Sequence, residues 1–150
     1  DVAPSRGLGD VYKRQELGDL RMAAVVAVNA LGDIFDPSTG KKIAGLRTAD
    51  GTSFGDSCEE LWKMGRRENL FTGNTTIGAV FTNGKFNKAQ MNKIASMTRN
   101  AYARCINPVG TMADGDSIYA ASAGDVEADL NVAGTLAAYV MERAIVAAIR

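Results

Sequence analysis

A threonine that follows an asparagine at the start of an apolar run is the strongest chemical feature of this sequence. Gly73-Asn74-Thr75-Thr76 opens a β-branched run that continues to Thr82. Locally, this pattern predicts a loop leading into a buried strand, and most such junctions carry no chemistry. Asn74-Thr75-Thr76 also matches a glycosylation acceptor, although nothing else marks a secreted chain. The local sequence leaves these interpretations open.

The chain contains no histidine, which removes the usual general base and the usual nitrogen ligand for zinc. Ser-His-Asp and Cys-His hydrolases are therefore excluded. If the protein performs acyl chemistry, another group must act as the base. An N-terminal α-amine, with an ordinary pKa of about 7.7 to 8.0, can do so near neutral pH.

The composition indicates one domain with a sizeable core, because 150 residues with a hydrophobic fraction of 46% fit a globular protein. Lys and Arg (17) balance Asp and Glu (17), so the long-range field that would hold nucleic acid or an anionic membrane is missing. Small neutral partners are favoured. Cys58 and Cys105 have neither the spacing of a disulfide framework nor a CxxC motif, so we expect reduced thiols and a cytoplasmic protein.

Two motifs resemble the self-processing peptidases of the DmpA type, the L-aminopeptidase/D-esterase and β-peptidyl aminopeptidase family. The first is GNTTIGAVFTNGKFNKAQ, from Gly73, and the second is DGDSIYAASAG, from Asp114. The resemblance implies that a precursor cuts itself between Asn74 and Thr75, and that Thr75 becomes the nucleophile. Its own freed α-amine would then act as the base. The resemblance implies no metal and no cofactor.

The resemblance also implies roles for three further residues. Asn29, at the end of an apolar run, corresponds to an amide that stabilises the oxyanion. Asp114 and Asp116 correspond to a Ser-Gly-Glu pattern whose groups orient the nucleophile and hold the amine of the substrate. Asp-Gly-Asp departs from that pattern, which keeps the acidic function and leaves the role of Asp114 open. From the local sequence alone, all three would be turn residues beside strands.

Apolar periodicity predicts strands and helices around these residues. Strands are expected over residues 22–29, buried on both faces, over 42–46, over 75–83, where Asn83-Gly84 suggests a tight reversal, and over 117–123. A helix capped by Asn87 is expected to bury one face, whose residues fall at three- and four-residue spacing: Met91, Ile94, Ala95, Thr98, Ala101, Tyr102 and Cys105. A short helix is expected over residues 59–66, with Trp62 and Phe71 packed into the core.

The last predicted helix covers residues 125–150, begins near Asp125 and is apolar on nearly all sides, so we expect it to be buried between layers. Glu142-Arg143 interrupt its apolar run, and it is not predicted to span a membrane. Together these elements predict an α+β protein with helices covering a sheet. The resemblance implies a four-layer α/β/β/α sandwich like that of ornithine acetyltransferases.

The same resemblance implies a domain organisation. Residues 16–74 would be the C-terminal part of an α-subunit and residues 75–150 a nearly whole β-subunit, folded together as one domain. Partners would be the missing N-terminal segment of the α-subunit and further copies of the processed unit in a homo-oligomer. Residues 1–15 end in GDVYKRQ, which resembles translated adapter read-through, so they are interpreted as a non-native leader. A genuine polar tail is the alternative.

The activity implied by the resemblance is hydrolysis of small amide, ester or peptide substrates that bear a free amine. Acyl transfer is one alternative, because ornithine acetyltransferases share the fold and also cleave themselves before a threonine. An inactive fragment is the other, because much of the expected substrate pocket would lie in the missing α-subunit segment. We therefore expect this piece alone to be inactive.

Overall fold

The computed structural model describes residues 13–64 and 74–149, which form two sheets and three helices. The larger sheet consists, in spatial order, of β1 (Lys13–Leu17), β2 (Leu20–Asn29), β5 (Thr75–Gly84) and β7 (Ser117–Val126). The smaller sheet consists of β4 (Lys41–Ala44), β3 (Asp33–Asp36) and β6 (Ile106–Asn107). The helices are α1 (Ser57–Met64), α2 (Lys88–Cys105) and α3 (Leu130–Ile149). A mixed fold of sheets and helices, as predicted, is confirmed.

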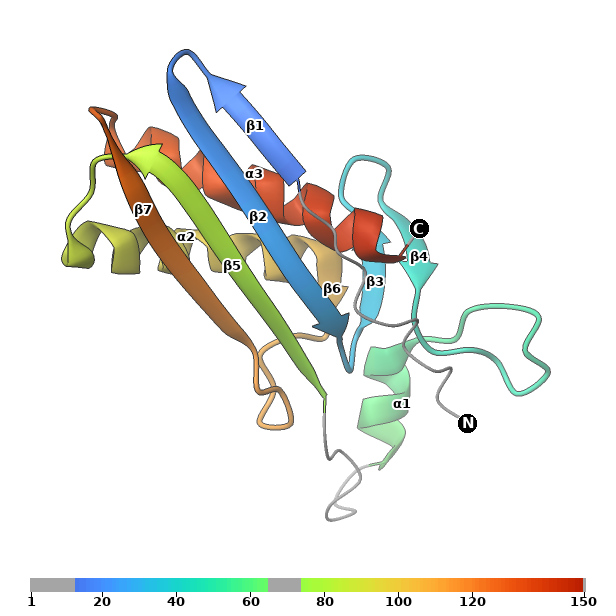
Figure 1. Ribbon diagram of the computed structural model, residues 1–150. Coiled ribbons are helices and arrows are strands. Elements are labelled where there is room, and N and C mark those ends of the chain that lie inside the picture. Colours follow the sequence, from blue (N-terminus) through green and yellow to red (C-terminus); the bar gives the residue numbers. More distant parts are fainter. Residues whose placement is uncertain (1–12, 65–73, 150) are drawn as a thin grey trace.

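Strand β5 lies in the centre of the larger sheet and has neighbours of both kinds. It pairs antiparallel with β2 and parallel with β7, and α2 makes the crossover that the parallel pair requires. Figure 1 shows α2 and α3 lying against the same face of this sheet. The end of β2 and the beginnings of β5 and β7 therefore meet at one end of the sheet.

The hairpin of β1 and β2 was not predicted. Leu17 pairs with Leu20 across a turn in which Gly18 has a φ of +58°, a conformation that glycine adopts without strain. Strand β1 includes Lys13, Arg14 and Gln15, which the sequence analysis left out of the fold. Residues 1–12 lie outside the described part of the chain, and the origin of the leader stays a prediction.

The core lies between the helices and the sheet face that they cover. Helix α2 is capped as predicted, because Asn87 and Gln90 exchange the two hydrogen bonds of a capping box. Its buried side chains are the predicted ones except for Ala95: Met91, Ile94, Thr98, Ala101, Tyr102 and Cys105. Full burial of a side chain as large as those of Met91 and Ile94 stabilises the fold by about 1.5–3 kcal/mol.

The prediction that residues 22–29 are buried on both faces is wrong for the described residues. Burial in β2 alternates, because the helices cover only one face of the sheet. On the other face Ile77, Phe81 and Tyr119 are about half exposed or more, at 49%, 49% and 66%. The larger sheet thus has one face in the core and one apolar face open in the described chain.

Helix α3 begins five residues later than predicted, at Leu130. Its cap is Asp129, whose carboxyl accepts hydrogen bonds from the backbone N–H groups of Asn131 and Val132. Asp125 belongs to β7 instead, because that strand continues to Val126. The helix is long and apolar enough to cross a membrane by length and composition, a test that core helices also pass.

Two further predictions about packing are wrong. Tyr139 on α3 is 46% exposed, so that helix is buried on one side and not between two layers. Trp62 on α1 is 74% exposed, like the rest of a helix that has no buried residue, and Phe71 lies outside the described residues.

The predicted tight reversal at Asn83-Gly84 is also wrong. Both residues belong to β5, and Gly84 still pairs with Val126 of β7.

The carboxyl of Asp33, which is 2% exposed, joins β3 to β4 and α1. It accepts hydrogen bonds from Lys42 Nζ (2.6 Å), the N–H of Leu46 (2.9 Å), and the N–H and hydroxyl of Ser57 (3.0 and 2.7 Å). Burial alone would raise the pKa of this carboxyl, but the hydrogen bonds outweigh it and lower the pKa. This cluster fixes the segment that precedes residues 65–73.

Candidate active site

Thr75 is the first residue of β5, and its hydroxyl lies beside the peptide bond that precedes it. The hydroxyl donates to the Asn74 carbonyl oxygen at 2.6 Å. Asn74 forms an isolated parallel bridge with Asp114, and the N–H of Gly115 donates to the same carbonyl at 3.3 Å. The predicted scissile bond is therefore held next to the loop that leads into β7, with the candidate nucleophile within reach of its carbonyl group.

Asn29 is the last residue of β2 and the register partner of Thr75. Directly opposite residues in an antiparallel pair carry their side chains on the same face, with Cβ atoms about 4.5–5.5 Å apart. This face is the one away from the helices, since Thr76, the next residue of β5, is completely buried on the helix side. The structure thus brings together Asn29 and Thr75, as the predicted oxyanion role requires.

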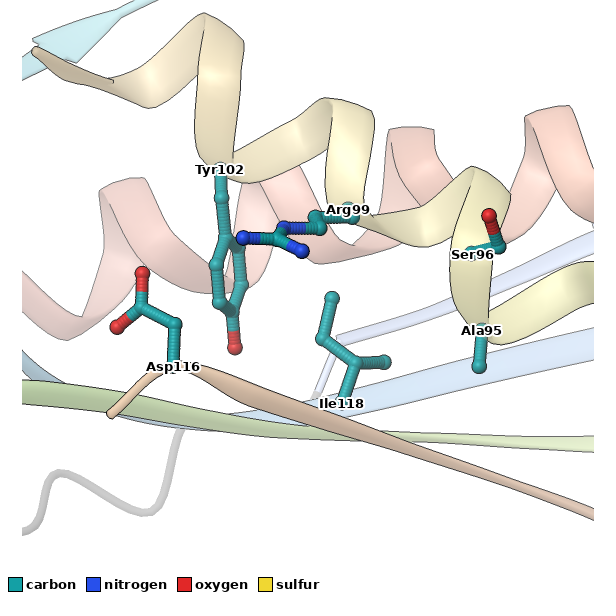
Figure 2. Close-up of a pocket in the computed structure, with 6 residues that line it drawn as sticks. All are labelled: Ala95, Ser96, Arg99, Tyr102, Asp116 and Ile118. Carbon is teal, nitrogen blue, oxygen red and sulfur yellow. The ribbon is translucent and has the colours of Figure 1, made fainter. Parts of the chain in front are cut away.

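The Asp116 carboxyl lies on the opposite face of the sheet from the Thr75 side chain. Its Oδ1 accepts a hydrogen bond of 2.7 Å from the N–H of Thr76. Figure 2 shows this carboxyl pointing toward α2, where it lines a cavity of about 180 Å³ with Arg99, Tyr102 and Ile118. Asp116 therefore holds the backbone directly after the candidate nucleophile, Thr75.

Burial raises the pKa of the Asp116 carboxyl, and the negative charge of Asp114 acts in the same direction. The N–H of Thr76 and the guanidinium of Arg99 act in the opposite direction but do not cancel the effect of burial. Loss of a proton from Asp116 is thus more costly than from an ordinary carboxyl. The strength of its bond to Thr76 will depend on pH.

Asp114 uses its carboxyl within its own loop. Oδ2 accepts hydrogen bonds from the N–H and the hydroxyl of Thr111, at 2.7 and 2.9 Å. The two aspartates that the sequence places one glycine apart therefore have different partners: Asp114 shapes the loop and Asp116 holds β5. Their backbones lie beside Asn74 and Thr75 as predicted, whereas their role toward a substrate amine stays a prediction.

Two residues at the site were missed by the sequence analysis. A Cβ on Gly115 would lie 2.8 Å from the Thr75 hydroxyl oxygen, so the loop passes too close to Thr75 for a side chain. Tyr102, predicted only as a core residue, donates to the carbonyls of Thr76 (3.4 Å) and Ser117 (3.3 Å) and ties the starts of β5 and β7 to α2. Burial raises the pKa of this phenol, which keeps it a donor. For Gly115, the available signal in the sequence was a glycine between two aspartates.

The described residues contain no group of three or more His, Cys, Asp or Glu side chains that could hold a metal ion. Cys105 is buried in the core, and burial raises the pKa of its thiol to about 12, so it is a poor nucleophile. The Thr75 hydroxyl, in contrast, lies beside a backbone carbonyl that also accepts a hydrogen bond from the N–H of Gly115.

The family model described as peptidase family S58 matches residues 7–150. An uncharacterized aminopeptidase of Mycobacterium leprae is 32% identical over 108 residues, which are 71% of this chain and 30% of that protein. A 6-aminohexanoate-oligomer endohydrolase of a Kocuria species is 29% identical over 128 residues, or 81% of this chain and 34% of that protein. The chain thus spans about a third of the length of these curated relatives.

Proposed function

The chain belongs to peptidase family S58, and on that premise we propose that it is part of a self-cleaving amidohydrolase whose nucleophile is Thr75. The observation that carries the proposal is the 2.6 Å contact between the Thr75 hydroxyl and the Asn74 carbonyl oxygen. This hydrogen bond holds the hydroxyl beside the carbonyl group whose carbon it would attack, and a nucleophile that is already positioned lowers the entropic cost of the attack. The names of the relatives, aminopeptidase and endohydrolase, support hydrolysis of an amide bond.

The first reaction is internal. The Thr75 hydroxyl oxygen bonds to the carbonyl carbon of Asn74, the bond from that carbon to the Thr75 nitrogen breaks, and the hydroxyl proton passes to the nitrogen. Water then hydrolyses the resulting ester, which leaves a carboxylate on Asn74 and a free α-amine on Thr75. With no histidine in the chain, this α-amine supplies a base near neutral pH.

Turnover repeats the chemistry on a substrate. The Thr75 α-amine takes the hydroxyl proton while the oxygen attacks the substrate carbonyl, the Asn29 amide stabilises the oxyanion, and the leaving amine receives the proton. Water then releases the acyl group from Thr75. Asp116 positions the nucleophile through the Thr76 amide, and Asp114 supports the loop beside it. The proposed substrates are small amides, esters or peptides with a free amine.

The open face of the larger sheet supports the remaining part of the proposal. Ile77, Phe81 and Tyr119 expose apolar surface on the same face as the side chains of Asn29 and Thr75. An apolar sheet face of this kind is normally covered by a second layer. We place there a second sheet from the full-length protein, which would complete the four-layer sandwich of the DmpA type, and further copies of the processed unit would complete the oligomer.

Intact mass spectrometry of the full-length precursor tests the proposal. It should yield two fragments whose masses correspond to a cut between Asn74 and Thr75, and Thr75→Ala should leave one uncut chain. Thr76→Ala is the matched control and should still be cut between Asn74 and Thr75. The hydroxyl of Thr76 lies on the helix side of β5, where it is fully buried. A cut before Thr76, or activity in a folded chain that is never cut, would contradict the assignment of Thr75.

A further inference from the structure

We propose that the backbone N–H of Gly115 is an oxyanion donor for the reaction at Thr75. The proposal deepens the proposed function and rests on it. The observation is that this N–H already donates to the Asn74 carbonyl oxygen, at 3.3 Å, in the chain before cleavage. That oxygen is the atom that becomes negatively charged when the Thr75 hydroxyl adds to the Asn74 carbonyl carbon.

The loop that carries Gly115 is held at both of its ends. On one side, Asp114 accepts two hydrogen bonds from Thr111, and the N–H of Asp114 donates to the Thr111 carbonyl at 3.1 Å. On the other side, β7 begins at Ser117 in parallel register with Ile77 of β5. A donor fixed in this way needs no reorganisation when charge develops on the oxygen, which is the property that makes oxyanion donors effective.

Space, and not backbone conformation, explains why this position is a glycine. A Cβ would lie 2.8 Å from the Thr75 hydroxyl oxygen and 3.6 Å from its Cγ2. The loop therefore approaches Thr75 closely enough for its N–H to reach the carbonyl that Thr75 attacks. A side chain would push the loop and the hydroxyl apart, and the N–H would lose its acceptor.

Gly115 and Asn29 flank Thr75 from opposite sides. Asn29 ends β2, the antiparallel neighbour of β5, and Gly115 precedes β7, the parallel neighbour. In turnover the substrate carbonyl takes the place of the Asn74 carbonyl at the same nucleophile. One side-chain donor and one backbone donor would then share the charge of the substrate oxyanion, as in sites with two fixed donors.

The N–H can be removed without adding a side chain. Glycolic acid replaces Gly115 during cell-free translation of the full-length precursor, which turns the amide into an ester. Because one oxyanion donor typically accounts for about 100- to 1000-fold in rate, self-cleavage should slow by that factor. The control places lactic acid at Ala113, whose N–H donates to the Thr111 hydroxyl at 3.3 Å in the same loop. Its cleavage rate should stay within about threefold of the unaltered precursor.

Three outcomes separate this inference from the proposed function. Slow cleavage with the Gly115 ester, near-normal cleavage with the Ala113 ester and none with Thr75→Ala support both. Equal cleavage rates for the two esters, with Thr75→Ala uncut, overturn the inference and leave the nucleophile in place. Cleavage of Thr75→Ala at the same bond overturns both, because the carbonyl of Asn74 would then be attacked by another group.

Discussion

Asn29 and Thr75 are register partners across β2 and β5, so the last side chain of one strand lies beside the first side chain of the other. The pair stands on the sheet face opposite the one that α2 and α3 cover. On the covered face, the Asp116 carboxyl holds the N–H of Thr76 at 2.7 Å. The sheet thus separates the groups that would react from the groups that hold them in place.

Asn29→Ala should lower the rate of turnover far more than it lowers stability. An exposed amide that acts on the transition state should cost about 100- to 1000-fold in kcat when it is removed. Asn83→Ala at the opposite end of β5 is the control. Asn83 accepts from the N–H of Arg21 and donates to the Asp19 carbonyl, so its loss should lower the free energy of unfolding by about 1 kcal/mol and leave kcat unchanged. Steady-state kinetics and denaturant unfolding of each variant measure kcat and the free energy of unfolding separately. If Asn29→Ala changes kcat as little as Asn83→Ala does, the role of Asn29 is structural.

As the pH is lowered, the rate of self-cleavage should begin to fall at a pH above the ordinary pKa of an aspartate. Burial raises the pKa of Asp116, so this carboxyl gains a proton, and weakens as an acceptor for Thr76, at a higher pH than an exposed one. Arg99 opposes this shift. Arg99→Gln should therefore move the acid limb of the rate profile to higher pH at low salt, and the shift should shrink as salt screens the exposed guanidinium.

Arg99→Lys should keep the profile of the unaltered chain, and Arg104→Gln at the end of the same helix, where the side chain pairs with Glu142, should not move it. The amide chemical shift of Thr76 in a Thr75→Ala background reports the ionisation of Asp116 without any activity. An Arg99→Gln profile that matches the original at low salt would show that Arg99 does not act on Asp116.

Asp33→Ala should destabilise the fold strongly. The substitution leaves Lys42, with 17% of its side chain exposed, without the carboxylate that it pairs with, and it leaves the N–H of Leu46 and Ser57 without an acceptor. Breaking a buried pair of this kind costs about 3 kcal/mol or more. Urea unfolding of the uncut Thr75→Ala precursor measures it, with Asp50→Ala in an exposed turn as the control of small effect.

The pH dependence of that stability follows from the lowered pKa of Asp33. A carboxyl whose pKa is lower in the folded state contributes stability that is fully present above its ordinary pKa and is lost as the pH falls through the lowered value. The difference in unfolding free energy between the original chain and Asp33→Ala should therefore be constant at neutral pH and shrink in acid. A difference that grows in acid would contradict the direction of the pKa shift.

The proposed need for a free amine is tested with an aminoacyl p-nitroanilide and its N-acetyl form. The mature full-length enzyme should hydrolyse the first and lose activity on the second, because the proposed substrates carry a free amine and acetylation removes its positive charge. Equal rates would point to an endohydrolase-like use of internal amide bonds instead. Ornithine added together with the N-acetyl form is the control for acyl transfer. The acetyl group would then pass from the substrate nitrogen to the amine of ornithine, and N-acetylornithine would form faster than acetate.

Local patterns determined the elements that need few distant contacts. The capping box of Asn87 and Gln90 and the stripe of apolar residues on α2 are set by neighbours three and four residues apart, so the sequence predicted them. The strand that begins at Thr75 was also predicted from local sequence, because a β-branched run follows a turn sequence there. Because this chain contains no histidine, its sequence alone directed attention to a base of another kind.

Long-range pairing decided what local patterns could not. Continuous apolar runs look alike whether one or both faces are buried, so the open face of β2 depended on where the helices lie. Asp129, and not Asp125, caps α3 because β7 continues to pair with β5 as far as Val126. Likewise, one glycine between Asp114 and Asp116 says nothing about which partner each carboxyl takes. The parallel register of β5 and β7 settles it. It brings the Gly115 N–H to the Asn74 carbonyl and the Asp116 carboxyl to the Thr76 amide, and these contacts join residues 41 and 40 positions apart in the chain.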